Sequence, residues 1–373
     1  MLIAVNTRLL LKDKLEGIGW FTYESLKRIT KNHPEHKFLF LFDRPFSDEF
    51  IFSDNVSPLV VGTQARHPFL WYWWFEQSLP KIFHKEEPDL FLSPDGYLSL
   101  CSSVKSVAVI HDLNFEYYPL DIPFIARKYY KKYFQQYAKK ANRIATVSEY
   151  SKQDISKTYK VSLDRIDVVY DGANEAFTPI GEEEKKRVKW KYANGEEYFL
   201  FVGALSPRKN VARLLKAFDE YKKAETSKMK FLIVGEKLFM TSEIENVYSS
   251  MKFKGDVDFT GRLGTSELKD VMASAFALTF VPYFEGFGIP IVEAMYCDVP
   301  VITSNVTSMP EVAGNAGLLV DPFSVNSIKE GMIKIYKDDV LRNHLIANGR
   351  KQREKFSWDK TAEKLWKCIE KTI

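Results

Sequence analysis

The sequence has few cysteines, no long apolar run and almost no excess of charge. Three cysteines are scattered over 373 residues, which is typical of a reducing compartment (Cys101, Cys297 and Cys368). No apolar run approaches the ~18 residues of a membrane span. The start MLIAVNTRLLL lacks a cationic leader and a small-residue cleavage site. Because 53 basic residues nearly balance 49 acidic ones, nucleic-acid binding is not indicated either. We therefore expect a soluble, cytoplasmic protein.

What the sequence does contain is ample material for packed α/β domains. Hydrophobic residues make up 45% of the chain and charged residues 27%, and the length predicts two domains. Short apolar runs alternate with longer amphipathic ones, which favours parallel sheets covered by helices. The expected strands of a first unit are 2–6, 37–42, 90–94, 106–112 and 143–148, and those of a second unit are 198–205, 230–236, 257–261, 276–283 and 299–305. Breaking glycines and a proline place the hinge near residue 171.

The stretch YFEGFGIPIVEAM, residues 283–295, follows one of these expected strands. Its glycines allow close approach of a ligand to the backbone, and Pro290 suits the first turn of a helix. The start of such a helix favours an anion. Glu285 flanks that position, and Glu293, inside an apolar run, can accept two hydrogen bonds from a diol such as a ribose. By itself the motif is equally compatible with a plain turn whose acids are solvated.

A second loop supports the anion hypothesis. In GALSPRKNVARLL, Arg208 and Lys209 stand just before a predicted helix that Asn210 can cap. Cations at a helix start oppose its dipole, so this placement favours an anion between them, although solvated surface charge is the simpler interpretation of such residues.

Three further features carry weaker signals. His111 follows a strand in VIHD, at the edge where parallel sheets bind ligands, although a lone histidine is more often structural. The segment GIGW, with Gly17 and Gly19, is similar to a phosphate-approach loop but lacks the full glycine pattern. The pair formed by Asp256 and Asp258 opens a strand instead of ending one, and we interpret it as structural and not as a metal site.

Taken together, EGFG with Glu293, SPRKN, VIHD and TVSEYSK resemble the retaining glycosyltransferases of family 4, over nearly the whole chain. The resemblance implies the GT-B fold, an α/β architecture with two Rossmann-like, doubly wound domains that face a cleft. Residues 1–170 would bind the acceptor and residues 171–355 the nucleotide-sugar, with a closing helix at about 356–373 that crosses back onto the first domain.

The resemblance also implies roles for individual residues. Arg208 and Lys209 would meet the donor diphosphate, Glu293 its ribose, and His111 the sugar near the reacting carbon. The transferred sugar would contact Glu285 and the backbone of the loop that follows it (Gly286, Phe287 and Gly288). Gly17 and Gly19 would close over the diphosphate, and three further residues would border the nucleotide (Gly203, Gly261 and Leu263). No bound metal and no cofactor other than the nucleotide-sugar co-substrate is implied, since cationic side chains would stabilise the departing diphosphate.

The partners are a nucleotide-sugar and a glycan or lipid-linked saccharide acceptor, and the resemblance favours GDP-mannose and polysaccharide or O-antigen assembly. A helix over residues 127–140, RKYYKKYFQQYAKK, would have five aromatic residues on one face and most of its lysines on the opposite face. We expect the aromatic face to pack on its own sheet, with a peripheral contact at the inner membrane face as the alternative. Two other functions stay open, a nucleotide-sugar epimerase of the same fold and a non-catalytic sugar-nucleotide binding protein.

Overall fold

The computed structural model describes residues 1–62, 64–236 and 241–373, and its chain forms two compact units. The first unit comprises Met1–Gly172 together with Trp358–Ile373, and the second comprises Ala173–Ser357. The boundary lies beside the predicted hinge, and the chain re-enters the first unit close to the predicted position of about 356.

A seven-stranded, all-parallel sheet forms the centre of the first unit, in the order β3-β2-β1-β4-β5-β6-β7. Its inner strands are buried on both faces, which explains why they read as continuous apolar runs. The strands are β1 (Leu2–Asn6), β2 (Lys37–Phe42), β3 (Val56–Val60), β4 (Leu90–Ser93), β5 (Lys105–Val109), β6 (Arg143–Thr146) and β7 (Ile166–Val168).

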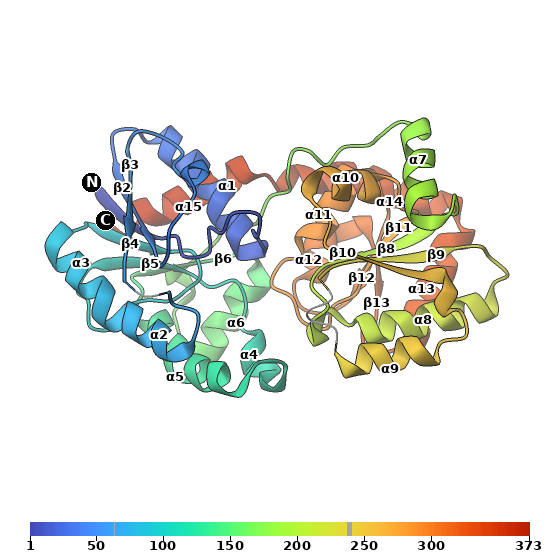
Figure 1. The fold of residues 1–373 in the computed structure, drawn as a ribbon, viewed down its shortest axis with the longest axis horizontal. Helices are drawn as coiled ribbons and strands as arrows, with labels where there is room; N and C mark the ends of the chain where they lie inside the picture. The colour runs from blue at the N-terminus through green and yellow to red at the C-terminus, as the bar shows by residue number, and fades with distance from the viewer. Residues whose placement is uncertain (63, 237–240) are drawn as a thin grey trace. The chain divides into compact units, whose positions relative to one another are not determined.

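Helices cover both faces of this sheet. They are α1 (Gly17–Asn32), α2 (Pro68–Trp73), α3 (Leu79–Glu86), α4 (Asn114–Tyr117), α5 (Phe124–Lys140), α6 (Glu149–Tyr159) and α15 (Trp358–Glu370). A π-helical turn, Trp74–Ser78, joins α2 to α3. Helices α1 and α15 lie on one face, and α2, α3 and α5 lie on the other (Figure 1).

The aromatic face of α5 packs into the core of the first unit. Tyr129, Phe134 and Tyr137 are buried there, and Tyr130 and Tyr133 pack against the same cluster. The packing interpretation of this face is therefore confirmed.

The last helix, α15, docks against α1. Arg28 on α1 pairs with Asp359, the ring of His33 stacks on Trp366 at 3.6 Å, and the Thr361 hydroxyl donates to the carbonyl of Tyr170. These contacts hold the C-terminal segment on the first unit, in line with the predicted closing helix.

The second unit is built on a six-stranded parallel sheet in the order β10-β9-β8-β11-β12-β13. Its strands are β8 (Tyr198–Val202), β9 (Lys230–Val234), β10 (Val257–Gly261), β11 (Ala277–Phe280), β12 (Val301–Ser304) and β13 (Gly317–Val320). Its helices are α7 (Glu182–Ala193), α8 (Val211–Ala224), α9 (Ser242–Ser250), α10 (Thr265–Ala273), α11 (Ile289–Tyr296), α12 (Met309–Ala313), α13 (Val325–Lys337) and α14 (Asp339–Gln352). Helices α10 and α11 lie on one face of the sheet, and α8, α9 and α13 on the other (Figure 1).

Candidate functional site

The loop that follows β11 leads directly into α11, as the sequence predicts. Gly288 is the residue before the helix and has a φ of +92°, a conformation that favours glycine. A Cβ there would also lie 2.9 Å from the terminal methyl group of Met309, which would have to shift. Pro290 falls in the first turn, where its missing N–H is not needed. The predicted glycine turn and helix start are thus confirmed.

Three charged side chains meet beside this helix start. Arg208 and Lys209 lie in a short turn, Pro207–Lys209, after β8, and both donate hydrogen bonds to the carboxylate of Glu285. All three side chains are largely buried, with 25%, 12% and 13% of their surface exposed, respectively. The structure therefore brings together the two predicted cations and the first predicted glutamate.

The two loops are also joined through their backbones. The Tyr283 amide donates to the carbonyl of Arg208 at 3.0 Å. From a third segment, before α12, the Ser308 hydroxyl donates to the carbonyl of Glu285 at 2.8 Å. The Lys209 ammonium lies 4.7 Å from the centre of the Phe280 ring, which is a cation–π distance. These contacts fix the cluster before any ligand arrives.

The charges of the cluster determine the ionisation of Glu285. Burial alone would raise the pKa of this carboxyl, but the charges and hydrogen bonds of Arg208 and Lys209 outweigh burial and keep the pKa below its ordinary value. Glu285 is therefore a carboxylate at neutral pH, and the cluster of two cations and one anion carries a net charge of +1.

Asn210 has a different role from the one predicted. It occupies the position before α8, but with a φ of +66° its side chain makes no capping hydrogen bond. Its amide instead donates to the carbonyls of Val281 and Pro322, at 3.1 and 2.7 Å. The predicted helix cap is wrong, because the Asn210 side chain binds these two carbonyls instead of the amides of α8. The hydrogen bond to Val281 connects the start of α8 to the loop after β11.

Glu293 lies on α11, in the second turn of the helix, and its side chain is half-buried. Within the described parts of the chain its carboxyl group forms no hydrogen bond and no ion pair. Burial raises its pKa from 4.5 to about 8, with no nearby charge to offset the effect. Glu293 is thus a carboxyl group that the folded protein leaves available to a ligand, as a diol-binding role would require.

Glycines stand at the carboxyl ends of three neighbouring strands, β8, β9 and β10. Two of them, Gly203 and Gly261, were predicted, and the third, Gly235, was not singled out. The Gly203 amide donates to the carbonyl of Val234, and the Gly235 amide donates to that of Gly261. A Cβ on Gly235 would lie 2.0 Å from the carbonyl oxygen of Gly203, so this close approach requires glycine. Gly203 also lies near Lys209, whereas Leu263 is half-buried in the loop before α10.

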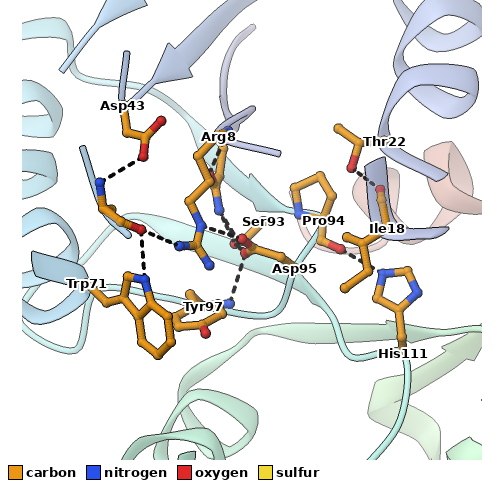
Figure 2. A network of polar contacts seen from close by, with 12 residues as sticks. Arg8, Ile18, Thr22, Asp43, Trp71, Ser93, Pro94, Asp95, Tyr97 and His111 are labelled. Carbon is orange, nitrogen blue, oxygen red and sulfur yellow. Dashed lines mark hydrogen bonds and ion pairs between the residues drawn. The ribbon is translucent and has the colours of Figure 1, made fainter. Parts of the chain in front are cut away.

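In the first unit, His111 follows β5 by two residues, at the expected edge of the sheet. Its Nε2 lies 2.8 Å from the carbonyl oxygen of Pro94 (Figure 2). A carbonyl only accepts, so Nε2 carries the proton and donates. Burial lowers the pKa of His111, which favours the neutral ring with Nδ1 as a free acceptor. The ring is further held by an edge-on contact with Phe21, at 5.0 Å between centroids.

The predicted loop at GIGW is in fact helical. Gly17 opens α1, and Gly19 lies in its first turn, where a Cβ would come within 3.1 Å of the Leu9 carbonyl oxygen. The loop prediction is therefore wrong, because the segment continues into the amphipathic pattern without interruption. The helix start nevertheless lies near His111, since Phe21 of α1 contacts that ring (Figure 2 shows Ile18 of α1 beside it).

A buried charge pair that the sequence did not indicate supports the loop beside His111. Arg8 donates through Nε to Asp95 at 2.6 Å, and their side chains are 7% and 4% exposed. Asn6 donates to the same carboxylate at 2.8 Å. The Arg8 guanidinium also lies 4.3 Å from the centre of the Tyr97 ring. Asp95 follows Pro94, so this network fixes the residue whose carbonyl orients His111.

Comparison with known proteins identifies the family. The model of "Glycosyltransferase Family 4" matches residues 16–177, and that of "Glycosyl transferases group 1" matches residues 182–352. "O-antigen chain mannosyltransferase RfbU" of Salmonella typhimurium is 32% identical over 272 residues, which cover 72% of this chain and 71% of the relative. The chain is a family 4 glycosyltransferase.

Further comparisons agree on the family and on the fold. "O-antigen chain mannosyltransferase B" of Escherichia coli is 27% identical to this glycosyltransferase over 94% of both chains. Sucrose-phosphate synthase from Thermosynechococcus elongatus has a TM-score of 0.80 at 17% identity, over 99% of this chain and 98% of its own. WaaG, a glycosyltransferase involved in lipopolysaccharide biosynthesis, has a TM-score of 0.75 at 15% identity, over 97% and 98%. The predicted GT-B fold is thus confirmed.

The described residues of this glycosyltransferase offer neither a metal-binding cluster nor a membrane-spanning helix. Across residues 1–62, 64–236 and 241–373, histidine, cysteine and acidic side chains form no group suited to hold a metal ion. Asp256 pairs with Lys222 and Lys230, both at 3.0 Å, which confirms the structural interpretation of that acidic residue. No helix in the same ranges combines the length and apolarity needed to cross a membrane.

Proposed function

We propose that this glycosyltransferase moves mannose from GDP-mannose to a glycan or lipid-linked saccharide acceptor, with retention of anomeric configuration and without a bound metal. Two relatives that are named O-antigen mannosyltransferases support mannose as the sugar. The cluster of Arg208, Lys209 and Glu285 at the start of α11 is the observation that carries the proposal.

This cluster supplies what the departure of a nucleoside diphosphate requires. When the bond between the sugar and the donor breaks, negative charge grows on the diphosphate oxygen. Arg208 and Lys209 are held in place before the ligand binds, so little reorganisation is needed at that moment. The amides at the start of α11 add positive potential of the same sign. In this proposal the two cations stabilise the leaving diphosphate, and Glu285 contacts the transferred sugar while its carboxylate remains bonded to them.

The remaining residues divide between nucleotide and sugar. Glu293 accepts hydrogen bonds from the ribose diol, for which its unpaired carboxyl is suited. The glycines at the ends of β8 and β10, Gly203 and Gly261, leave space beside the nucleotide. His111 faces the sugar with its Nδ1 free as an acceptor, since Nε2 is engaged with Pro94.

A binding screen tests the donor. Thermal shift would be measured with GDP-mannose, GDP, UDP-glucose and UDP, because a ligand at one hundred times its dissociation constant stabilises by about 2.7 kcal/mol. We expect the guanine nucleotides to stabilise the wild type and to have a weaker effect on Glu293→Ala. Glu330→Ala, an exposed position on α13, is the matched control. Stabilisation by UDP-glucose alone would contradict the choice of donor while leaving the glycosyltransferase assignment intact.

Product analysis tests the reaction itself. A transferase releases GDP in step with mannosylated acceptor, an epimerase alters the donor without acceptor, and a binding protein converts nothing. The anomeric configuration of the new linkage, read by NMR, tests retention. An inverted linkage would contradict the proposed stereochemistry.

A further inference from the structure

One surface of the first unit combines exposed aromatic side chains with unpaired cations. On α2, Phe69 and Trp73 are 73% and 56% exposed, and Tyr72 between them is exposed as well. The spacing of three and four residues places them on one side of the helix. Trp74 and Phe75, which follow in the π-helical turn, are fully buried. The aromatic residues are therefore divided between the core and solvent.

Helix α5 continues this surface. Trp71 of α2 stacks on Tyr130 of α5 at 5.7 Å, and the ring of Tyr72 lies 6.1 Å from that of Tyr133. Both helices lie on the same face of the first sheet (Figure 1). At the start of α5, Phe124 is 57% exposed. We call this the α2–α5 surface, made of Phe69, Tyr72, Trp73, Phe124, Lys128, Lys131 and Lys132.

The cations of this surface have no anionic partner among the residues that the structure describes. Residues 122–148 contain no aspartate or glutamate, and neither do residues 64–75. Six basic residues lie on α5, and none of them forms an ion pair with the described part of the chain (Arg127, Lys128, Lys131, Lys132, Lys139 and Lys140). Lys128 instead lies 4.4 Å from the Phe124 ring, and Lys132 lies 5.0 Å from the Tyr133 ring.

Helix α7 of the second unit shows the contrast. Its cations Lys185 and Lys186 each pair with a glutamate three residues earlier, and its other three cations also have a glutamate partner, within the helix or outside it. Its exposed aromatic residue, Trp190, is 71% exposed, on a helix whose cations are paired in this way. The α2–α5 surface thus differs from α7 in that its exposed aromatic groups lie beside cations without an ion-pair partner among the described residues.

We propose that the α2–α5 surface docks this glycosyltransferase on an anionic phospholipid bilayer. Phe69, Trp73 and Phe124 would insert at the level of the headgroups, where aromatic rings are favoured. Lys128, Lys131 and Lys132 would contact lipid phosphates while their aliphatic stems lie along the aromatic rings. The surface differs from the aromatic face of α5 considered from sequence, which is buried. The proposal does not depend on the identity of the donor sugar.

Vesicle flotation tests the docking. The full chain is mixed with vesicles of phosphatidylcholine, or of phosphatidylcholine and phosphatidylglycerol, at low and at high salt. We expect flotation only with phosphatidylglycerol, and weaker flotation at high salt because the charges are solvent-exposed. Each lysine near an anionic surface contributes about fivefold to binding, so Lys128→Gln/Lys131→Gln/Lys132→Gln should weaken it by about a hundredfold. Phe69→Ser/Trp73→Ser/Phe124→Ser should also weaken it, at unchanged net charge.

Matched controls come from the second unit. Lys185→Gln/Lys186→Gln/Lys191→Gln alters the net charge by the same amount, and Trp190→Ser removes an equally exposed aromatic ring. We expect both to float like the wild type, with melting temperatures showing that every variant is folded. Equal losses in the α5 and α7 lysine variants would reduce the effect to net charge and overturn the proposal. Absence of flotation with phosphatidylglycerol at low salt would also overturn it. The proposal would also be overturned if the wild type did not bind vesicles but formed a dimer in sedimentation velocity, and if the aromatic variant were monomeric.

Discussion

Glu293→Gln should remove a pH dependence of stability that the wild type carries. In the ligand-free fold burial raises the pKa of Glu293 from 4.5 to about 8. Between these values the folded protein holds a proton that the unfolded chain has released, so the free energy of unfolding falls as pH rises. This contribution is fully present below pH 4.5 and lost above pH 8. One proton corresponds to about 1.4 kcal/mol per pH unit, which gives a loss of up to about 5 kcal/mol, and less where water reaches the carboxyl.

Thermal unfolding of the ligand-free protein between pH 5 and pH 9 measures this effect. For a unit the size of the second one, 1 kcal/mol shifts the melting temperature by about 2 to 4 °C. We expect the melting temperature of Glu293→Gln to exceed that of the wild type increasingly as pH rises. Glu330→Gln, which removes an exposed carboxyl, is the control and should follow the wild type. Parallel curves for Glu293→Gln and the wild type would refute the reasoning.

The same thermal unfolding measurement with bound GDP tests the proposed contact between Glu293 and the ribose. Ribose hydroxyls that donate to Glu293 favour its carboxylate form, so bound GDP should lower its pKa. With saturating GDP, the fall in wild-type stability above pH 5 should therefore become smaller. An unchanged fall with GDP demonstrably bound would place the ribose elsewhere and leave the buried carboxyl without its proposed partner.

Three other outcomes are expected. Lys209→Ala should reduce kcat by about 10²- to 10³-fold with saturating donor and Lys209→Arg by less, and a folded alanine variant with near-normal kcat would make Lys209 a mere surface charge. Turnover should survive a strong chelator, and loss in EDTA that magnesium or manganese restores would contradict metal independence. Asp95→Ala should lower the free energy of unfolding, measured with denaturant, by about 3 to 5 kcal/mol because it leaves Arg8 buried and unpaired. Arg8→Met should lower it by less, because Asp95 keeps donors such as Asn6. Equal losses for the two variants would refute this reasoning.

The sequence predicted the interior of each sheet better than its edges. Every strand that the analysis missed is an edge strand, namely β3, β7 and β13. Edge strands have a neighbour on one side only, and these three are largely exposed or half-buried, so they lack the continuous apolar run of a central strand. Strand β3 also contains Pro58, a residue that is tolerated in an edge strand but not in a central one.

The candidate site was predictable where a short motif carries it. The turn at Gly288 and the helix start at Pro290 depend on the backbone conformations that these residues favour, so the local sequence is enough to predict them. The approach of Arg208 to Glu285 spans 77 positions and became foreseeable only through resemblance to a family. The pair of Arg8 with Asp95 spans 87 positions and matches no motif, so nothing in the sequence pointed to it.

The double pairing of Glu285 has a consequence for how the donor enters the site. In the ligand-free protein the carboxylate offsets one of two cations, so a diphosphate must share Arg208 and Lys209 with it. Glu285→Gln removes this competing charge. We expect the affinity for GDP to rise by about tenfold, which corresponds to ~1.4 kcal/mol and is modest for a nearby charge at an effective dielectric constant of ~20.

The same variant should lose turnover, because the amide cannot replace a carboxylate that contacts the transferred sugar. Calorimetric titration of GDP and kcat at saturating GDP-mannose separate the two effects. If affinity and kcat both fell in a folded variant, the role of Glu285 in holding the cations would outweigh its competition with the diphosphate, and the predicted rise in affinity would be wrong. If affinity rose while kcat stayed unchanged, the carboxylate would oppose donor binding without any part in the transfer.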